Sequence, residues 1–244
     1  MIKGEISGKD ALSFWYNLNN FAFTIAPEKC YCSGYIKRIP DVEGLVYRWG
    51  DFPYNWKDLG YTEKKFNQLK NIYYPSLQIG KLMSDMSKYK DRVVSLDLPM
   101  VGISEKEEII PSTKGRCLLH MVFCVARGFT LEAHIFYRIT ETSRKFLADI
   151  LFLDWVFSRN YGNDYHELKV RFHFVFVYSH IKQFPLIEVL FPGTLDSWEW
   201  EDMQRKEKIK KYMDGIRRGK FSKWGMIKGT EQLYWRKYGK SDIT

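Results

Sequence analysis

The centre of the chain alternates between apolar and polar residues over two neighbouring segments. In residues 117–125 every second side chain is apolar, and after Arg127-Gly128 the same alternation runs through residues 131–137. A period of two is typical of a strand with one buried face, and a short turn between two such strands joins an antiparallel pair. The pattern therefore predicts a β-hairpin.

Beyond this hairpin the spacing changes to that of a helix and then returns to that of a strand. Residues 141–157 carry apolar side chains three or four positions apart, which predicts a helix with one buried stripe. The stripe consists of Phe146, Ile150, Leu153 and Phe157. Residues 169–181 alternate again and predict a long strand. One of its faces carries Val170, Phe172, Phe174, Phe176, Tyr178 and His180. Strand, strand, helix and strand in this order indicate the α+β class, with a mostly antiparallel or mixed sheet packed by helices.

Weaker patterns predict elements nearer the N-terminus. Residues 10–19 have helical spacing with an acidic residue in the first turn, and residues 77–88 also have the spacing of a helix. We expect turns at Ile39-Pro40 and at Glu43-Gly44, because proline and glycine favour them. A short strand is expected to follow at residues 45–47.

Composition narrows the class of protein. The chain has 244 residues, enough for one large domain or two small ones, and 45% of them are hydrophobic and 27% charged, as in folded proteins. No apolar run approaches the ~18 residues that a membrane span needs, and residues 1–10 hold no apolar block like that of a secretory signal. The cysteines fit neither a disulfide framework nor a zinc pattern of standard spacing; they are Cys30, Cys32, Cys117 and Cys124. We therefore expect an intracellular, cytoplasmic protein without a membrane partner or a metal site.

The chain is basic, with 38 Lys and Arg against 29 Asp and Glu, and the excess is concentrated near the C-terminus. Residues 199–240 hold 13 basic and 6 acidic residues. Throughout the C-terminal segment 199–244 aromatic residues are interspersed with basic ones, which suits stacking on bases and contact with the phosphates of nucleic acid. The alternative is a solvated helix over residues 201–218 that covers the core with Met203, Ile209, Met213 and Ile216.

Four reactive or ligand-type residues follow one another through the predicted strands and helix: Cys117, Arg138, Asp149 and His180. They lie in the stretches RCLLHMVFCVARG, FYRITETSRKFLADILFLDWV and FVYSHIK. In order, spacing and context these stretches resemble the thymidylate synthase superfamily, which includes phage pyrimidine nucleotide hydroxymethylases. That family has a nucleophilic Cys opening a strand and an Arg-Ser closing the next. An Asn or Asp follows in the long core helix, and a His-x-Tyr ends the strand after it. The resemblance covers roughly residues 44–190.

The resemblance implies a single thymidylate synthase-like domain over residues 1–244, with a mixed sheet packed by helices, and a homodimer packed sheet to sheet. It also implies 5,10-methylenetetrahydrofolate as the cofactor and a pyrimidine nucleotide monophosphate as the substrate. Arg138 would bind the phosphate, and Arg92 matches an arginine that a partner subunit contributes in this family. Thr140 is the hydroxyl nearest to the family's Ser, and Lys182 stands in place of its Tyr. A viral protein inside a host cell is compatible with this family.

The chemistry of such a site is specific. A pyrimidine ring becomes nucleophilic at C5 only after a nucleophile adds at C6, and a cysteine thiolate can do this. Cys117 is the candidate nucleophile, and Arg116 and Arg138 would stabilise its thiolate. Asp149 is the candidate for recognising the base, because a carboxylate accepts a hydrogen bond from the N4 amine of cytosine, whereas an Asn matches uracil. In this family the Asp variant accompanies cytosine nucleotides, so the resemblance implies dCMP or CMP, with methylation or hydroxymethylation as the outcome. His180 is the third catalytic candidate.

The sequence departs from the family at several positions. The family's Pro-Cys-His is Arg116-Cys117-Leu118, its Arg-Ser is Arg138-Ile139, and its His-x-Tyr is His180-Ile181-Lys182. The early catalytic Glu and the N-terminal phosphate loop of the family have no counterpart, and no residues are assigned to the cofactor.

Several alternatives stay open beside the enzyme hypothesis. Cys117 could be a buried structural thiol, Asp149 a member of a structural salt bridge, and His180 a hydrogen-bonded core histidine. The fold could have lost its chemistry and bind nucleotides or nucleic acid. Cys117 with His180 or His120 could also form the dyad of a thiol hydrolase.

Overall fold

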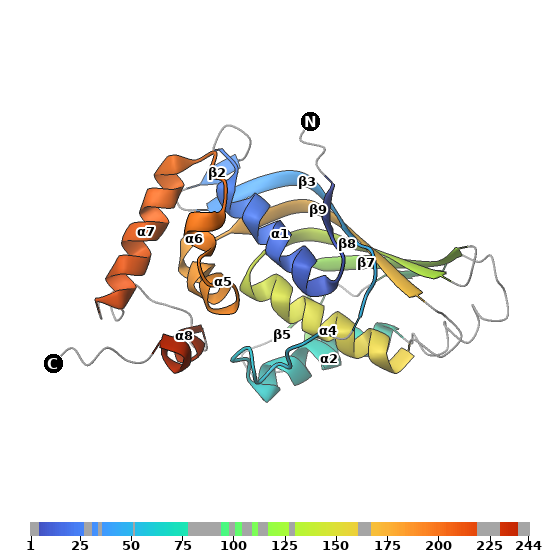
Figure 1. Ribbon diagram of the computed structural model, residues 1–244. Coiled ribbons are helices and arrows are strands. Elements are labelled where there is room, and N and C mark those ends of the chain that lie inside the picture. Colours follow the sequence, from blue (N-terminus) through green and yellow to red (C-terminus); the bar gives the residue numbers. More distant parts are fainter. Residues whose placement is uncertain are drawn as a thin grey trace.

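The structure is a computed structural model, and it describes residues 5–26, 31–33, 36–50, 52–77, 94–97, 101–103, 109–111, 117–126, 130–160, 167–218 and 230–238. A mixed sheet of seven described strands forms its centre, in the order β1-β3-β9-β8-β7-β4, with β2 also paired to β3 (Figure 1). These strands are β1 Ile6–Gly8, β2 Tyr31–Ser33, β3 Ile36–Val46, β4 Val94–Asp97, β7 Leu118–Ala126, β8 Thr130–Glu141 and β9 Glu167–Ser179. A separate hairpin pairs β5 Val101–Ile103 with β6 Ile109–Pro111.

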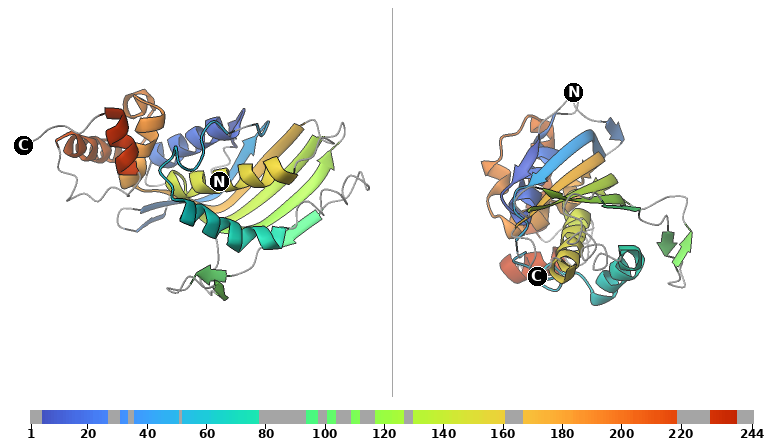
Figure 2. Two further views of the ribbon diagram at one scale, coloured as in Figure 1. Left: turned by 90° about the horizontal axis from the view of Figure 1, so that it is seen from below. Right: turned by 90° about the vertical axis from the view of Figure 1, so that its right-hand side faces the viewer.

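Helices cover one face and one end of this sheet. α4 (Arg144–Asn160) and α2 (Glu63–Leu77) lie on the same side of it (Figure 2), and α1 (Ala11–Thr24) packs against β3 and β9. The other helices gather at one end of the sheet (Figure 1): η2 Ile181–Gln183, α5 Phe184–Leu190, α6 Thr194–Ser197, α7 Met203–Arg217 and α8 Thr230–Tyr238. The combination of a mixed sheet and separate helices confirms the α+β class. Within the described part of the chain, no helix combines the length and the apolar character that crossing a bilayer requires.

The predicted hairpin and the helix after it are present. β7 and β8 are antiparallel neighbours, and the crossover through α4 makes β9 parallel to β8. All four residues of the expected apolar stripe of α4 are buried. The helix begins at Arg144 rather than at Glu141, because the Glu141 side chain accepts hydrogen bonds from the first backbone N–H groups of the helix and so caps it.

The helix expected at residues 10–19 is also present, as α1, and it continues to Thr24. Its N-terminus is fixed by a reciprocal pair of hydrogen bonds: the Asp10 carboxylate accepts the Ser13 N–H at 2.8 Å, and the Ser13 hydroxyl accepts the Asp10 N–H at 3.1 Å. Of the helix expected at residues 77–88, only Leu77 belongs to the described residues, and it is the last residue of α2.

The turns expected within residues 36–49 are wrong. β3 runs without interruption through Pro40 and Gly44, paired with β9 along its length. Gly44 is required by packing rather than by a turn, because a Cβ there would lie 2.3 Å from Cζ of Phe14 on α1. Strand pairing and helix packing thus override the local preference of these residues.

The alternation of buried and exposed side chains reverses at one level across three neighbouring strands. In β9 the even-numbered residues are buried up to Phe174, whereas Val177 is buried beyond the exposed Val175. The same reversal occurs at the exposed Arg138 in β8 and at the exposed Asp41 in β3, where φ is 49°. The registers of β3 with β9 and of β8 with β9 are the same on both sides of this level, so the reversals indicate a row of bulges that runs through the three strands together and turns the side chains beyond it to the other face.

Because of these bulges, two strand faces differ from those that the sequence predicts. In β7 the pairing register shifts between Leu118 and His120, so the alternation expected from Cys117 to Val125 is broken near its start. In β9 the face expected to run to His180 is fully buried only as far as Phe174. One extra residue in a strand turns every later side chain to the other face, which a simple period of two does not anticipate.

The two faces of the sheet differ in their surroundings. The helix-covered face packs a cluster of aromatic rings in stacked or edge contact, made by Phe14, Tyr137, Phe146, Phe172 and Phe174. On the opposite face, which we call the open face, no described helix packs over the centre of the sheet. Its described side chains are partly or fully exposed: His120, Val122, Cys124, Glu132, His134, Phe136, Arg171, His173 and Val175.

Candidate functional site

Cys117 lies immediately before β7, at the end of the sheet where β8 ends. Its carbonyl oxygen accepts the backbone N–H of Arg138 at 2.8 Å, so the two residues are cross-strand neighbours. The Cys117 side chain is half-buried against the core, whereas that of Arg138 is exposed at the level of the bulges. Two of the four predicted residues are thus brought together by the pairing of β7 with β8.

Lys145, in the first turn of α4, is a second cation near Cys117. Burial by itself lowers the pKa of this ammonium group, but the neighbouring Tyr178, Cys117 and Glu141 outweigh it and hold the pKa above its usual value. The Lys145 Nζ also donates a hydrogen bond to the Tyr178 hydroxyl at 3.3 Å. Lys145 therefore stays protonated at neutral pH and favours a negative charge on the Cys117 sulfur.

Asp149 is half-buried and lies one turn after Lys145 on α4, so the two side chains point to the same side of the helix. The Asp149 carboxylate is also near the buried Tyr61. Burial is the main cause that raises the pKa of Tyr61, and the charge of Asp149 adds to it. Tyr61 donates a hydrogen bond to the Arg144 carbonyl oxygen and so holds the loop against α4. The third predicted residue therefore shares a side of α4 with the cation that neighbours Cys117.

His180 follows β9 directly and caps the short helix η2. Its Nδ1 accepts the backbone N–H of Lys182 at 3.1 Å. Burial, together with the positive charges of Lys182 and Arg205, lowers the pKa of His180, which favours the neutral imidazole. Because Nδ1 is the acceptor, the neutral ring carries its proton on Nε2. His180 therefore presents a hydrogen-bond donor rather than a proton acceptor.

The remaining predicted site residues are Lys182, Thr140 and Arg92. The Lys182 side chain is exposed beside His180, where it could contact an anion. Thr140 is only 1% exposed near the end of β8, and its burial argues against direct contact with a phosphate from solvent. Arg92 lies outside the described residues.

Sequence reasoning missed Lys145 and Tyr178 as members of this site. Lys145 precedes Asp149 by four residues, a spacing that places side chains together on a helix. Tyr178 precedes His180 by two residues, and on a strand this spacing puts two side chains on one face. Both signals are present in the sequence, but which partner each residue meets depends on how α4 packs against the ends of β7 and β9.

A separate groove of about 530 Å³ lies between α2, α4 and the loop before α2. Its walls include Trp56, Phe66 and Trp155, with ring centroids 6.4 Å apart for Trp56–Phe66 and for Phe66–Trp155. None of the predicted site residues lines it. At 100° per residue along α4, the lining residue Ser158 lies about 180° around the helix from Asp149. The groove is therefore distinct from the surroundings of Cys117.

The C-terminal segment is described over residues 199–218 and 230–238. α7 buries Ile209, Met213 and Ile216 as the solvated-helix alternative expects, whereas Met203 is 57% exposed and does not cover the core. Among the aromatic residues of the segment, Tyr212 and Tyr234 are buried and hence not available for stacking on bases. A helix that covers the core and exposes its lysines describes α7 better than a stacking platform does.

Taken together, the Cys117 end of the sheet offers a half-buried thiol, the cation Lys145 that interacts with it, the backbone neighbour Arg138, and Asp149 one turn after Lys145 on α4. Cationic surroundings stabilise a thiolate and attract an anionic ligand. No protein-family model matches the chain, and no curated protein matches its sequence.

Proposed function

We propose that the protein transfers a one-carbon unit to C5 of a cytosine nucleotide, dCMP or CMP, through a covalent adduct on Cys117. The observation that carries this proposal is the interaction of the Lys145 ammonium group with the half-buried Cys117, which is also the backbone hydrogen-bond partner of Arg138. A thiolate in such surroundings is an effective nucleophile, and an arginine suits a phosphate through paired hydrogen bonds. The resemblance of the three motif stretches to the thymidylate synthase superfamily supplies the type of reaction.

In the proposed reaction the Cys117 thiolate adds to C6 of the ring, which forms a C–S bond and makes C5 an enamine carbon. C5 then bonds to the one-carbon unit. Loss of the C5 proton to a base would break the bond between the one-carbon unit and its carrier and leave an exocyclic methylene group on C5. Addition of water to this group would give the hydroxymethyl product, and addition of hydride from the folate carrier the methyl product. Departure of the thiolate from C6 would then restore the ring double bond and regenerate Cys117. Lys145 favours the thiolate at the first and the last step. His180 would donate a hydrogen bond to the substrate from Nε2.

Asp149 would select the base. Its carboxylate would accept a hydrogen bond from the N4 amine of cytosine, and Lys145 one turn earlier on the same side of α4 favours the ionised form. When bound, 5,10-methylenetetrahydrofolate would supply the one-carbon unit. The aromatic groove between α2 and α4 does not fit as its site, because Asp154 and Ser158, which line the groove, lie on α4 about 140–180° around the helix from Asp149 and Lys145.

Release of tritium from C5 tests this proposal, because C5 exchanges its hydrogen only after addition at C6. Wild-type protein incubated with dCMP or CMP tritiated at C5 is expected to release tritium when methylenetetrahydrofolate is present. The absence of release from either nucleotide, combined with salt-dependent binding of an oligonucleotide, would instead support a nucleic-acid-binding protein that has lost its chemistry.

We also propose that two copies of the chain pack through their open faces as a homodimer. Val175 supports this, because it is an apolar side chain 49% exposed at the middle of that face. Sedimentation at micromolar concentration is expected to give a dimer, and Val175→Lys is expected to shift it toward the monomer by placing like charges opposite each other. A wild-type monomer under these conditions would contradict the proposal and remove Arg92 from the candidate site.

A further inference from the structure

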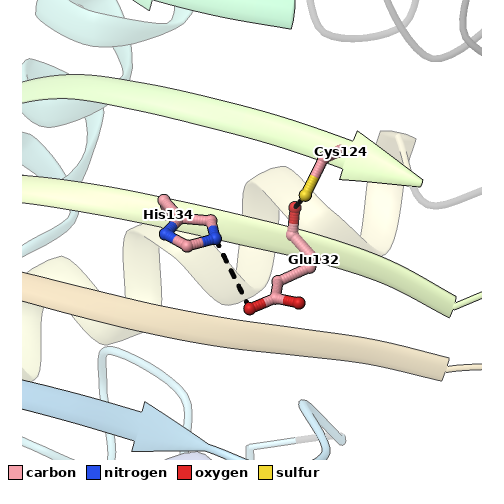
Figure 3. A group of neighbouring side chains, drawn as sticks. All are labelled: Cys124, Glu132 and His134. Carbon is pink, nitrogen blue, oxygen red and sulfur yellow. Dashed lines mark hydrogen bonds and ion pairs between the residues drawn. The ribbon is translucent and has the colours of Figure 1, made fainter. Parts of the chain in front are cut away.

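The open face carries a cluster of metal-binding side chains at the end of β7 remote from Cys117. Cys124 on β7 lies directly opposite Glu132 on β8 (Figure 3). His134 follows Glu132 by two residues and therefore shares its face of the sheet. The possible ligand atoms of these three residues all lie within 4.8 Å of one another.

A fourth residue orients the imidazole of His134. Its Nδ1 lies 3.1 Å from Nε2 of His173 on β9, and its Nε2 lies 3.4 Å from Oε1 of Glu132 (Figure 3). When Nδ1–H donates to His173, the lone pair of Nε2 faces a carboxylate oxygen. In the other tautomer Nε2–H would donate to Glu132, so binding of a metal ion at Nε2 selects the tautomer in which Nδ1–H donates to His173. Histidine ligands of metals are commonly oriented in this way, by a hydrogen bond from the ring nitrogen that does not bind the metal.

We propose that Cys124, Glu132 and His134 bind a divalent transition-metal ion, of which Zn²⁺ is the best match. Thiolate, imidazole and carboxylate are all zinc ligands, and three protein ligands leave a fourth tetrahedral position for water. That position faces away from the sheet, on a side where no described helix packs and where the proposed homodimer would place the partner subunit. The ion would join β7 to β8 across the open face. This metal site does not depend on the proposed transfer reaction.

Arg171 is the competitor of the metal ion for Glu132. Its Nε donates a hydrogen bond to Oε1 of Glu132, and its guanidinium group also lies 3.9 Å from the carboxylate of Glu5. Binding of an ion requires Arg171 to move away from Glu132, and Glu5 offers it a second anion. Arg171→Gln removes the competing charge and is expected to tighten metal binding about fivefold, the effect of one unit charge near the surface.

Titration of the full chain with Co²⁺, a spectroscopic substitute for Zn²⁺, tests the proposal. After treatment with a chelator under reducing conditions, the wild-type protein is expected to show the absorption of four-coordinate Co²⁺ and a thiolate-to-cobalt charge-transfer band that Zn²⁺ abolishes. Cys124→Ser should lose the band, and His134→Ala should weaken binding at least about a hundredfold. His173→Ala, which removes only the orienting group, should weaken it about ten- to a hundredfold.

Cys117→Ser is the matched control, because it makes the same chemical change at the other end of β7 and should leave the band intact. A wild-type protein without the band would overturn the proposal, as would a Cys124→Ser protein that keeps it. Wild-type affinity of His134→Ala for Co²⁺ would have the same consequence. Glu132→Gln serves as an independent ligand variant if Cys124→Ser does not fold. As a second measurement, Zn²⁺ should raise the melting temperature of the wild-type protein but not that of His134→Ala.

Discussion

Cys117 and Cys124 stand at the two ends of β7, in surroundings of opposite charge. Cys117 is next to Arg138 and close to the protonated Lys145. Cys124 lies against Glu132, and burial together with this negative charge raises the pKa of its thiol. Cationic surroundings make the first cysteine suited to nucleophilic attack, whereas the second stays a thiol and is a poor nucleophile unless a metal ion binds it. The same side chain thus acquires different chemistry from the neighbours that strand pairing and helix packing provide.

The difference follows from what covers each end of the strand. At Cys117 the first turn of α4 brings Lys145 over the end of the sheet. At Cys124 no described helix is present, and the two other members of the cluster come from β8: Glu132 directly opposite and His134 two residues further. A strand face without a covering helix leaves its side chains available to bind an ion, while a strand end covered by a helix can hold a substrate away from water.

The largest expected effect separates the two cysteines by function. Cys117→Ser should lower tritium release from C5 more than about a thousandfold, because it removes the nucleophile of the proposed reaction. The same variant should bind Co²⁺ as the wild type does. Cys124→Ser should give the reverse pattern, with the charge-transfer band lost and a far smaller effect on tritium release. Equal losses of tritium release in both variants would contradict the proposed difference in function between Cys117 and Cys124.

The next largest effect is on the stability of the folded protein, and it comes from an ion pair at the end of the sheet next to His180. There the buried Asp202 forms an ion pair with Lys37, which pairs with Ser179 across β3 and β9. Burial alone raises the pKa of Asp202, but hydrogen bonds from Lys37 and from the Arg205 N–H outweigh it and hold the pKa below its usual value. Asp202→Asn removes the carboxylate charge that pairs with the buried Lys37 and should reduce the free energy of unfolding by about 3–5 kcal/mol at pH 7.

The pH dependence of this effect has a definite sign. A carboxylate with a lowered pKa in the folded state stabilises the protein above its unfolded pKa of about 4 and loses that contribution as the pH falls further. The stability gap between wild type and Asp202→Asn should therefore narrow below about pH 4 in urea titrations. Glu207→Gln, an exposed carboxylate on the same helix, should change stability by less than about 0.5 kcal/mol at any pH. A gap that stays constant with pH would show that Asp202 is not the titrating group.

A smaller effect tests the choice of base at the Cys117 end. Asp149→Asn is nearly isosteric but exchanges an acceptor pair for one acceptor and one donor. It should shift the preference from dCMP or CMP toward dUMP by about ten- to a hundredfold in relative affinity. Titration of both proteins with the three nucleotides measures this shift. If wild type and variant bind all three alike, Asp149 is a structural carboxylate.

The smallest expected effect tests the difference in electrostatic surroundings between Cys117 and Cys124. Lys145→Gln removes one positive charge near Cys117 and should slow alkylation of Cys117 by iodoacetamide about fivefold at neutral pH. The rate at Cys124 should not change, because Lys145 lies at the other end of the strand. Peptide mapping by mass spectrometry gives both rates from one reaction. Equal slowing of the two cysteines would point to a general change of structure instead.

Local patterns in the sequence determined several elements of this protein. The β7–β8 hairpin, the buried stripe of α4 and the start of α1 at Asp10 all depend on residues close together in the chain. Their periods of two and of three to four residues hold because each element has one face in the core. The sequence alone therefore predicts the order of Cys117, Arg138, Asp149 and His180 along these elements, although their chemical roles stay predictions.

Only the tertiary structure decided where those patterns fail and which side chains meet. β3 passes through Pro40 and Gly44 because β9 pairs with it and Phe14 packs on it, which no local preference reveals. Lys145 becomes a member of the Cys117 site only because α4 packs with its first turn near Cys117. The cluster of Cys124, Glu132 and His134 matches no linear zinc pattern, since its ligands come from two strands and the orienting His173 from a third. Contacts between elements depend on register and packing, and these are set by the whole chain at once.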